Sequence, residues 1–278
     1  MRHTAAVLAA AACLLPTARA DEPSRLLADA ASAFRAGKYD QAADLAQRAA
    51  DAAPNDPTAP ALAGRAYAAA GRYDAAVRAF TAALGRDPKQ AAVYDARGDA
   101  HLKLGKFREA VADFDAFLAA RPGRAPDHWR RGIALYCAGR YADGAKQFDL
   151  HRTVNPQDVE NSAWHYLCTA RAAGRETARK ALLPVTGDAR VPMPQVLEMF
   201  AGRLKPQDVI DAADRAGLAG DRLTAARFYA RLYVGLFFEA EGDAAKAKEY
   251  LAEAVEKYKV PDYMWDVANV RLKALAAK

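Results

Sequence analysis

Three kinds of residue recur at intervals of 34 through the first half of this chain. The glycines are Gly37, Gly71, Gly105 and Gly139. The prolines are Pro54, Pro88, Pro122 and Pro156. The aromatic residues are Tyr39, Tyr73, Phe107 and Tyr141. A period of this length indicates a stack of similar units, because one such unit cannot bury its apolar face alone.

Each unit has the pattern of two helices joined by a turn. A glycine such as Gly71 can end the first helix in the left-handed conformation. Tyr73, Ala76 and Phe80 then fall three and four residues apart, on one face of the second helix. Pro88 ends the unit because proline cannot continue a helix.

A second glycine series, Gly64, Gly98 and Gly132, lies inside the first helix of successive units. Glycine in a helix interior costs about 1 kcal/mol relative to alanine, so a close contact between helices has to compensate. We expect small residues of the second helix to make that contact, namely Ala76, Ala110 and Gly144. Phenylalanines would fill the space beside it, at Phe80, Phe114 and Phe148.

The complete set of residues that keep these positions over 57–158 is Gly64, Tyr67, Gly71, Tyr73, Ala76, Phe80, Pro88, Gly98, Gly105, Phe107, Ala110, Phe114, Pro122, Gly132, Gly139, Tyr141, Phe148 and Pro156. This pattern resembles the tetratricopeptide repeat, a helix–turn–helix unit of 34 residues. Residues 23–56 and about 228–261 resemble it more weakly. The resemblance implies an all-α solenoid, a right-handed superhelix in which the first helix of each repeat lines a concave groove.

The repeats suggest four parts of the chain. Residues 1–20 precede the fold, and residues 21–192 hold four repeats and a degenerate fifth one. Residues 193–227 match no repeat and are expected to form an irregular helical segment. Residues 228–278 hold one further repeat and an amphipathic helix that caps it.

Residues 1–20 have the pattern of a secretory signal peptide. Basic residues at Arg2 and His3 precede an apolar run over 5–15, and small residues end at Ala20. We expect cleavage after Ala20 and export to the periplasm or the medium. Cys13 offers a lipoprotein signal as the alternative, which would attach the protein to a membrane. The residues before Cys13 lack the large aliphatic residue that such a signal usually has three places earlier.

Charge and motifs argue against several functions. The formal net charge is +6, and the basic residues are mixed with acidic ones, which gives nucleic-acid binding no support. The sequence has no glycine-rich phosphate loop, nucleophile elbow or HExxH pattern, so we predict no catalysis and no cofactor. Histidines fall on separate predicted helices, at His101, His128, His151 and His165.

The resemblance also implies which side chains face the groove. These are Arg65, Asp99, Lys103, Trp129, Tyr136, Trp164 and Arg171. Some family members clamp a terminal carboxylate in this groove, but the clamp positions here hold Leu27, Ala31, Ala61 and Arg65. Two interpretations of the aromatic residues stay open. They form an exposed patch that anchors a partner, or the irregular segment folds over them and they become core.

Cys137 and Cys168 fall on neighbouring predicted helices. Two free buried thiols, a disulfide, and a zinc site shared with His165 are the alternatives. A disulfide needs the two α-carbons within about 7 Å. A structural zinc site needs four ligands, and the sequence shows no fourth.

These observations predict an exported, bacterial cell-envelope scaffold that binds other proteins through its groove. The first alternative is a structural subunit of an envelope complex that contacts its partners through residues 183–227. The second alternative is an enzyme or a metal-binding protein.

Overall fold

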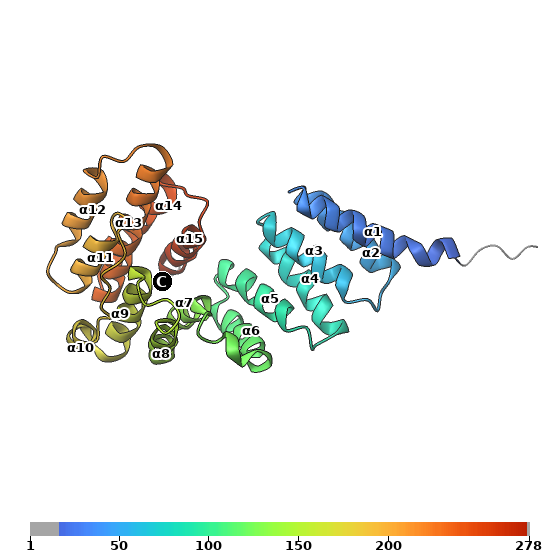
Figure 1. Cartoon of the computed structure of the whole chain (residues 1–278), viewed down its shortest axis with the longest axis horizontal. Coiled ribbons are helices and arrows are strands. Elements are labelled where there is room, and N and C mark those ends of the chain that lie inside the picture. Colours follow the sequence, from blue (N-terminus) through green and yellow to red (C-terminus); the bar gives the residue numbers. More distant parts are fainter. Residues whose placement is uncertain (1–16, 277–278) are drawn as a thin grey trace, which may run out of the picture. The chain divides into compact units, whose positions relative to one another are not determined.

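The structure is helical throughout the residues it describes. The computed structural model describes residues 17–276, with side chains from Glu22 onward, and this range holds fifteen α-helices, one short 3-10 helix and no strand (Figure 1). The all-α prediction is therefore confirmed. The predicted signal peptide, its cleavage after Ala20 and the lipid alternative at Cys13 lie outside the described side chains.

The chain forms two compact units, Met1–Pro88 and Lys89–Lys278. The first unit contains two helical hairpins, formed by α1 (Thr17–Arg35) with α2 (Tyr39–Ala52) and by α3 (Thr58–Ala69) with α4 (Tyr73–Arg86). Its core is made mainly of small side chains such as Ala30, Ala46 and Ala63, which let the helices approach closely.

The second unit begins with three further hairpins. They pair α5 (Ala91–Lys103) with α6 (Phe107–Ala120), α7 (Trp129–Cys137) with α8 (Tyr141–His151), and α9 (Val159–Ala173) with the short α10 (Arg175–Lys180). A 3-10 turn, Pro122–Arg124, lies between α6 and α7. Loop glycines end the first helices with positive φ, as at Gly71 (74°) and Gly139 (79°).

The interior glycines face an aromatic ring of the paired helix. A Cβ added to Gly64 would lie 2.5 Å from Phe80 Cδ1, and one added to Gly132 would lie 2.6 Å from Phe148 Cζ. The expectation that Ala76 and Ala110 make the nearest contact is therefore corrected, because the phenylalanine ring itself covers the glycine. Gly144 does approach Gly132 as expected, since an added Cβ would lie 3.5 Å from the Gly132 carbonyl oxygen, and it also leaves room for Cys168, whose Sγ would lie 2.7 Å from that Cβ.

Five helices follow residue 192 and complete the second unit: α11 (Met193–Phe200), α12 (Pro206–Asp214), α13 (Gly220–Glu241), α14 (Ala244–Lys257) and α15 (Tyr263–Ala276). Helix α13 starts inside the segment expected to be irregular and runs on into the sixth repeat. Helices α13 and α14 pair as a hairpin, and α15 packs against both α14 and α5. In Figure 1, α15 lies on the side of α7 opposite to α8.

None of the described helices has the length and apolar character that crossing a membrane would require.

Candidate functional site

Helix α15 covers the inner face of α5 in the second unit. Lys103 Nζ lies 3.3 Å from Asp99 Oδ2 and 3.4 Å from Asp266 Oδ2, and Asp266 belongs to α15. The Tyr263 hydroxyl of α15 donates a hydrogen bond to Asp99 Oδ1 at 2.7 Å. The two charged residues that the resemblance placed in the groove of α5 are thus bound by the protein's own C-terminal helix.

The predicted aromatic residues lie in the same covered region. Tyr136 and Trp164 are each only 2% exposed, so neither offers an open surface to a partner. Trp129 is half-buried and meets the Tyr263 ring edge-on, with centroids 4.9 Å apart. The Tyr136 hydroxyl donates to Glu239 Oε1 of α13 at 3.2 Å, so α13 and α15 provide the cover rather than α11 and α12.

Arg171 and Cys137 border a buried ion pair. Glu239 pairs with Arg271 of α15, and Arg171 Nη1 lies 3.4 Å from the Glu239 carbonyl oxygen, which accepts its hydrogen bond. Cys137 and Cys168 are both free thiols. Burial raises the pKa of Cys137 to about 11 and also raises that of Cys168, so both thiols are protonated and unreactive at neutral pH.

The described residues show no arrangement of three His, Cys, Asp or Glu side chains that could hold a metal ion. The histidines have separate partners. His165 Nε2 lies 3.3 Å from Asp149, and His128 Nε2 lies 2.9 Å from Asp95. Burial lowers the pKa of His101 and of His165, which favours their neutral forms.

Arg65 belongs to the first unit, at a position that the resemblance assigns to the inner helical face. Its side chain is exposed on α3. The matching positions of α1 hold Leu27, Ala31 and Phe34, all partly exposed. This face, defined by Leu27, Ala31, Phe34 and Arg65, is called the N-terminal inner face below.

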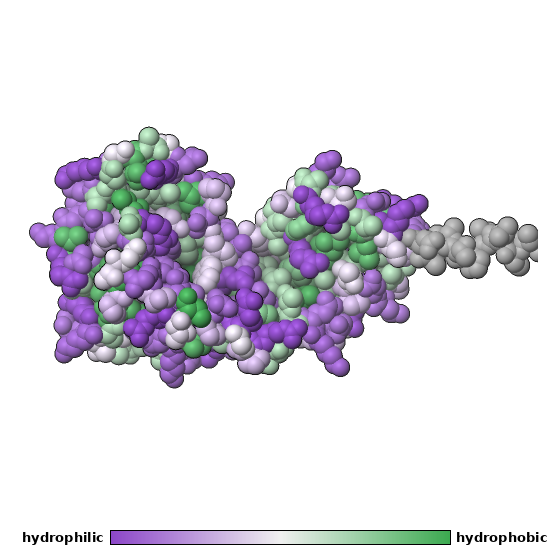
Figure 2. All heavy atoms as spheres, viewed as in Figure 1, coloured by the Kyte–Doolittle hydropathy of each residue, from purple (hydrophilic) through white to green (hydrophobic). Residues whose placement is uncertain are grey.

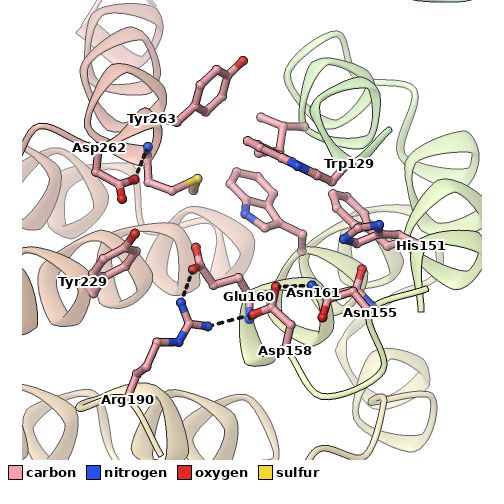
Figure 3. Close-up of a pocket in the computed structure, with 14 residues that line it drawn as sticks. Trp129, His151, Asn155, Asp158, Glu160, Asn161, Arg190, Tyr229, Asp262 and Tyr263 are labelled. Carbon is pink, nitrogen blue, oxygen red and sulfur yellow. Dashed lines mark hydrogen bonds and ion pairs between the residues drawn. The ribbon is translucent and has the colours of Figure 1, made fainter. Parts of the chain in front are cut away.

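The covered region of the second unit still contains a pocket of about 380 Å³ (Figure 3). Its polar wall carries Asp158, Glu160, Asp262 and Arg190. Its aromatic wall carries Trp129, Trp164, Tyr229 and Tyr263. Helices α7, α8, α9, α13 and α15 contribute to it, together with the loops before α9 and α15 and the loop between α10 and α11. We call it the acidic pocket.

The beginning of α9 explains why acids gather in this pocket. Asp158 caps the helix, and its Oδ1 accepts the Glu160 backbone N–H at 3.0 Å. Asp188 Oδ2 accepts the Val159 backbone N–H at 3.3 Å. Both carboxylates are thus placed at a helix N-terminus, where the backbone dipole favours negative charge.

Arg190 is shared among three carboxylates. Its guanidinium nitrogens lie 2.9 Å from Asp158, 3.0 Å from Glu160 and 2.7 Å from Asp188. Figure 3 shows the guanidinium between Asp158 and Glu160. One positive charge is therefore shared by three carboxylates and does not neutralise all of them, and Arg190 also ties the loop to α9.

Glu160 is the least well neutralised of these acids. Its Oε2 accepts a hydrogen bond from the Tyr233 hydroxyl at 2.8 Å. Burial, followed by repulsion from Asp158, nevertheless raises the pKa of Glu160 to about 7, despite the opposing effects of Tyr233 and Arg190. The carboxyl group is therefore partly protonated near neutral pH.

Two buried polar atoms lack a hydrogen-bond partner, and their residues line this pocket. They are Asn161 Oδ1, in a side chain that is 4% exposed, and Trp164 Nε1. Buried polar groups usually have partners, since an unmet one costs about 1–3 kcal/mol. The two atoms offer one acceptor and one donor to a bound molecule.

Sequence reasoning missed most of this pocket. It placed Trp129 and Trp164 on neighbouring inner faces, and the structure brings both to the pocket. It gave no role to Asp158, Glu160 or Arg190. Pro156, followed by Asp158 and Glu160, signals the start of a helix. No residue pattern near this helix start connects Arg190 to it.

Comparison with known proteins identifies the repeats. Three family models described as Tetratricopeptide repeat match residues 33–100, 96–158 and 229–259. No curated protein gives a significant match.

Solved structures share the fold. A tetratricopeptide repeat protein from Parabacteroides merdae is 16% identical, with a TM-score of 0.60, and the match covers 92% of this chain and 99% of that one. A MamA crystal structure is 14% identical with a TM-score of 0.54, covering 72% and 98%. MamA from Desulfovibrio magneticus RS-1 is 21% identical with a TM-score of 0.52, covering 58% and 90%.

At these identities the structural likeness concerns the fold alone. The family models identify the kind of repeat, because between them they match most of the predicted repeats, including the C-terminal one. The glycine-on-ring contacts recur in the hairpins of both units. The chain belongs to the tetratricopeptide-repeat family.

Proposed function

We propose that this protein is an exported scaffold that binds other proteins and has no catalysis of its own. The repeat fold supports this, and the observation that carries it is the N-terminal inner face. There Leu27, Ala31 and Phe34 leave apolar surface partly exposed beside the exposed Arg65. Apolar surface next to an arginine is typical of protein contact sites.

Charge reversal on this face tests the proposal. The protein is crosslinked in the cells that produce it and captured as wild type, as Arg65→Glu and as Arg48→Glu. Arg48 is an exposed arginine of α2 in the same unit and serves as the matched control. We expect at least one partner to fall by about tenfold with Arg65→Glu, a typical loss for an interface arginine, and to remain with Arg48→Glu. Equal partner sets for the two variants would contradict the proposal.

Export is part of the proposal and rests on the pattern of residues 1–20. Mass spectrometry of the protein recovered from the periplasm or medium should find a mature chain that begins at Asp21. A chain that keeps Met1, or one that begins at a lipid-modified Cys13, would contradict it.

Contact through residues 183–227 has weaker support. Much of the apolar surface of α11 and α12 is already buried within the second unit, including Met193, Val196, Phe200 and Val209. Arg190 and the loop around it are bound to α9.

A further inference from the structure

The acidic pocket has an excess of negative charge at its lining. Asp158, Glu160 and Asp262 line it, whereas Arg190 is the only Lys or Arg side chain among its described lining residues. That guanidinium is already shared with Asp188 outside the lining. The pocket also contains the imidazole of His151, whose Nδ1 lies 2.8 Å from the Pro126 carbonyl oxygen.

Aromatic rings line the same pocket, and Tyr229 lies beside Glu160 and Asp262. Trp129, Trp164, Tyr229 and Tyr263 give the pocket four rings in addition to its carboxylates. A cation placed over such a ring is attracted by its negative face, and the attraction grows when water is excluded. Rings and carboxylates together favour an organic cation over an anion or an uncharged apolar group.

The buried amide of Asn161 gives independent evidence for a ligand. Its Oδ1 is an acceptor without a donor, inside a residue that lines the pocket. A guanidinium or a primary ammonium brings several N–H donors, so it can satisfy this oxygen and a carboxylate together. Trp164 Nε1 is a donor without an acceptor, and a carbonyl oxygen near the cation would satisfy it.

We propose that the acidic pocket binds an organic cation with several N–H donors, that is, a guanidinium or a primary ammonium group. The cation contacts Glu160 and Asp262, lies against the tryptophan rings and donates to Asn161 Oδ1. Its source is a Lys or Arg side chain of a partner or a free small cation. The volume of about 380 Å³ lies within the range of roughly 300–1,000 Å³ that is usual for small-molecule sites.

Binding in this pocket depends on pH through Glu160. The groups that face Glu160 are Asp158 on its own helix, Arg190 and Asp188 from the loop, and Tyr229 and Tyr233 from α13. Asp262 lies near Tyr229 at the edge of the same pocket. A cation binds the ionised carboxylate, so affinity rises as the pH passes upward through about 7.

Calorimetric titration of the purified chain tests the inference with three probes. The first is the peptide acetyl-Gly-Arg-Gly-amide, and the second is the same peptide with citrulline, which keeps the shape of arginine without its charge. The third is methylguanidinium, a free guanidinium compound with the same single positive charge as the arginine peptide. Each is titrated at pH 6 and pH 8 into wild type, Glu160→Gln, Asp262→Asn and the control Glu256→Gln, whose side chain is exposed on α14.

We expect the arginine peptide to bind at least about tenfold more tightly than the citrulline peptide, which is the usual value of a charge-assisted contact. Glu160→Gln and Asp262→Asn should each remove most of that preference, and Glu256→Gln should keep it. Affinity for the arginine peptide should be higher at pH 8 than at pH 6 in wild type, and this difference should vanish in Glu160→Gln. Asp262 is exposed, so Asp262→Asn tests the pocket independently of how Glu160→Gln affects folding.

Tighter binding of the peptide than of methylguanidinium identifies a partner side chain as the source, and equal or tighter binding of methylguanidinium identifies a free cation. No binding of either compound overturns the inference, as does equal binding of the arginine and citrulline peptides. The inference is also overturned if Glu160→Gln and Asp262→Asn both keep the full preference for the arginine peptide over the citrulline peptide. These outcomes are separate from those of Arg65→Glu, which tests the scaffold proposal in the other unit.

Discussion

At the scale of single residues, Glu160 has the most unusual environment in the acidic pocket. Its pKa is about 7 in the folded protein and 4.5 in an ordinary setting. Below 4.5 the carboxyl is protonated in both the folded and the unfolded chain, so it does not affect stability. Between 4.5 and 7 the unfolded chain ionises first, and above 7 the folded protein bears the full cost of the buried charge.

Removing this charge should therefore stabilise the protein at high pH. We expect the unfolding free energy of Glu160→Gln, relative to that of wild type, to increase by on the order of 1–3 kcal/mol when the pH is raised from 5 to 8. Urea denaturation of both proteins at the two pH values measures this. Glu256→Gln should follow wild type, and a Glu160→Gln protein with the same pH dependence as wild type would show that the carboxyl ionises normally.

At the scale of elements, a contact between an interior glycine and a large side chain is shared by four of the hairpins. It recurs as Gly98 with Phe114, where an added Cβ would lie 2.8 Å from the ring. It also recurs in the C-terminal hairpin as Gly235 with Leu251, at 2.9 Å. A leucine thus takes the place of the ring in this weakly matching repeat.

Alanine substitutions at two glycines of the first unit should have opposite effects. Gly64→Ala should destabilise the protein by about 1–3 kcal/mol, because the methyl group meets the Phe80 ring and the helix-propensity gain is smaller. Gly85→Ala should stabilise it by roughly 0.5–1 kcal/mol, since nothing lies within 4 Å of its added Cβ. Thermal denaturation compares the two, and a stable Gly64→Ala protein would mean that the hairpins are packed more loosely.

The hairpins could be predicted from the sequence because their contacts are local and periodic. Gly64 and Phe80 are 16 residues apart, and the same offset returns in Gly98 with Phe114 and in Gly132 with Phe148. The acidic pocket could not be predicted in this way. Tyr263 binds Asp99, which lies 164 residues earlier in the sequence, and Arg190 binds Asp158 from a loop without a repeat pattern. Such contacts depend on how the C-terminal helices pack, which no spacing in the sequence records.

At the scale of the whole molecule, the two units offer different surfaces for recognition. The first unit leaves the N-terminal inner face open. In the second unit, α13 and α15 cover the inner face of α5 and α7, through Lys103 with Asp266 and Tyr136 with Glu239. These contacts restrict access to the part of the groove that Lys103, Tyr136 and Trp164 would line.

Hydroxyl-radical footprinting tests this restriction most directly, because it measures the exposure of individual side chains in solution. Tryptophan and tyrosine are intrinsically more reactive than leucine, but Tyr136 and Trp164 are buried while Leu150 is 38% exposed. We therefore predict that Leu150 is oxidised faster than either ring in the native protein, and that unfolding in urea reverses this order. Faster oxidation of Tyr136 and Trp164 in the native protein would show that the groove is open and would contradict the account.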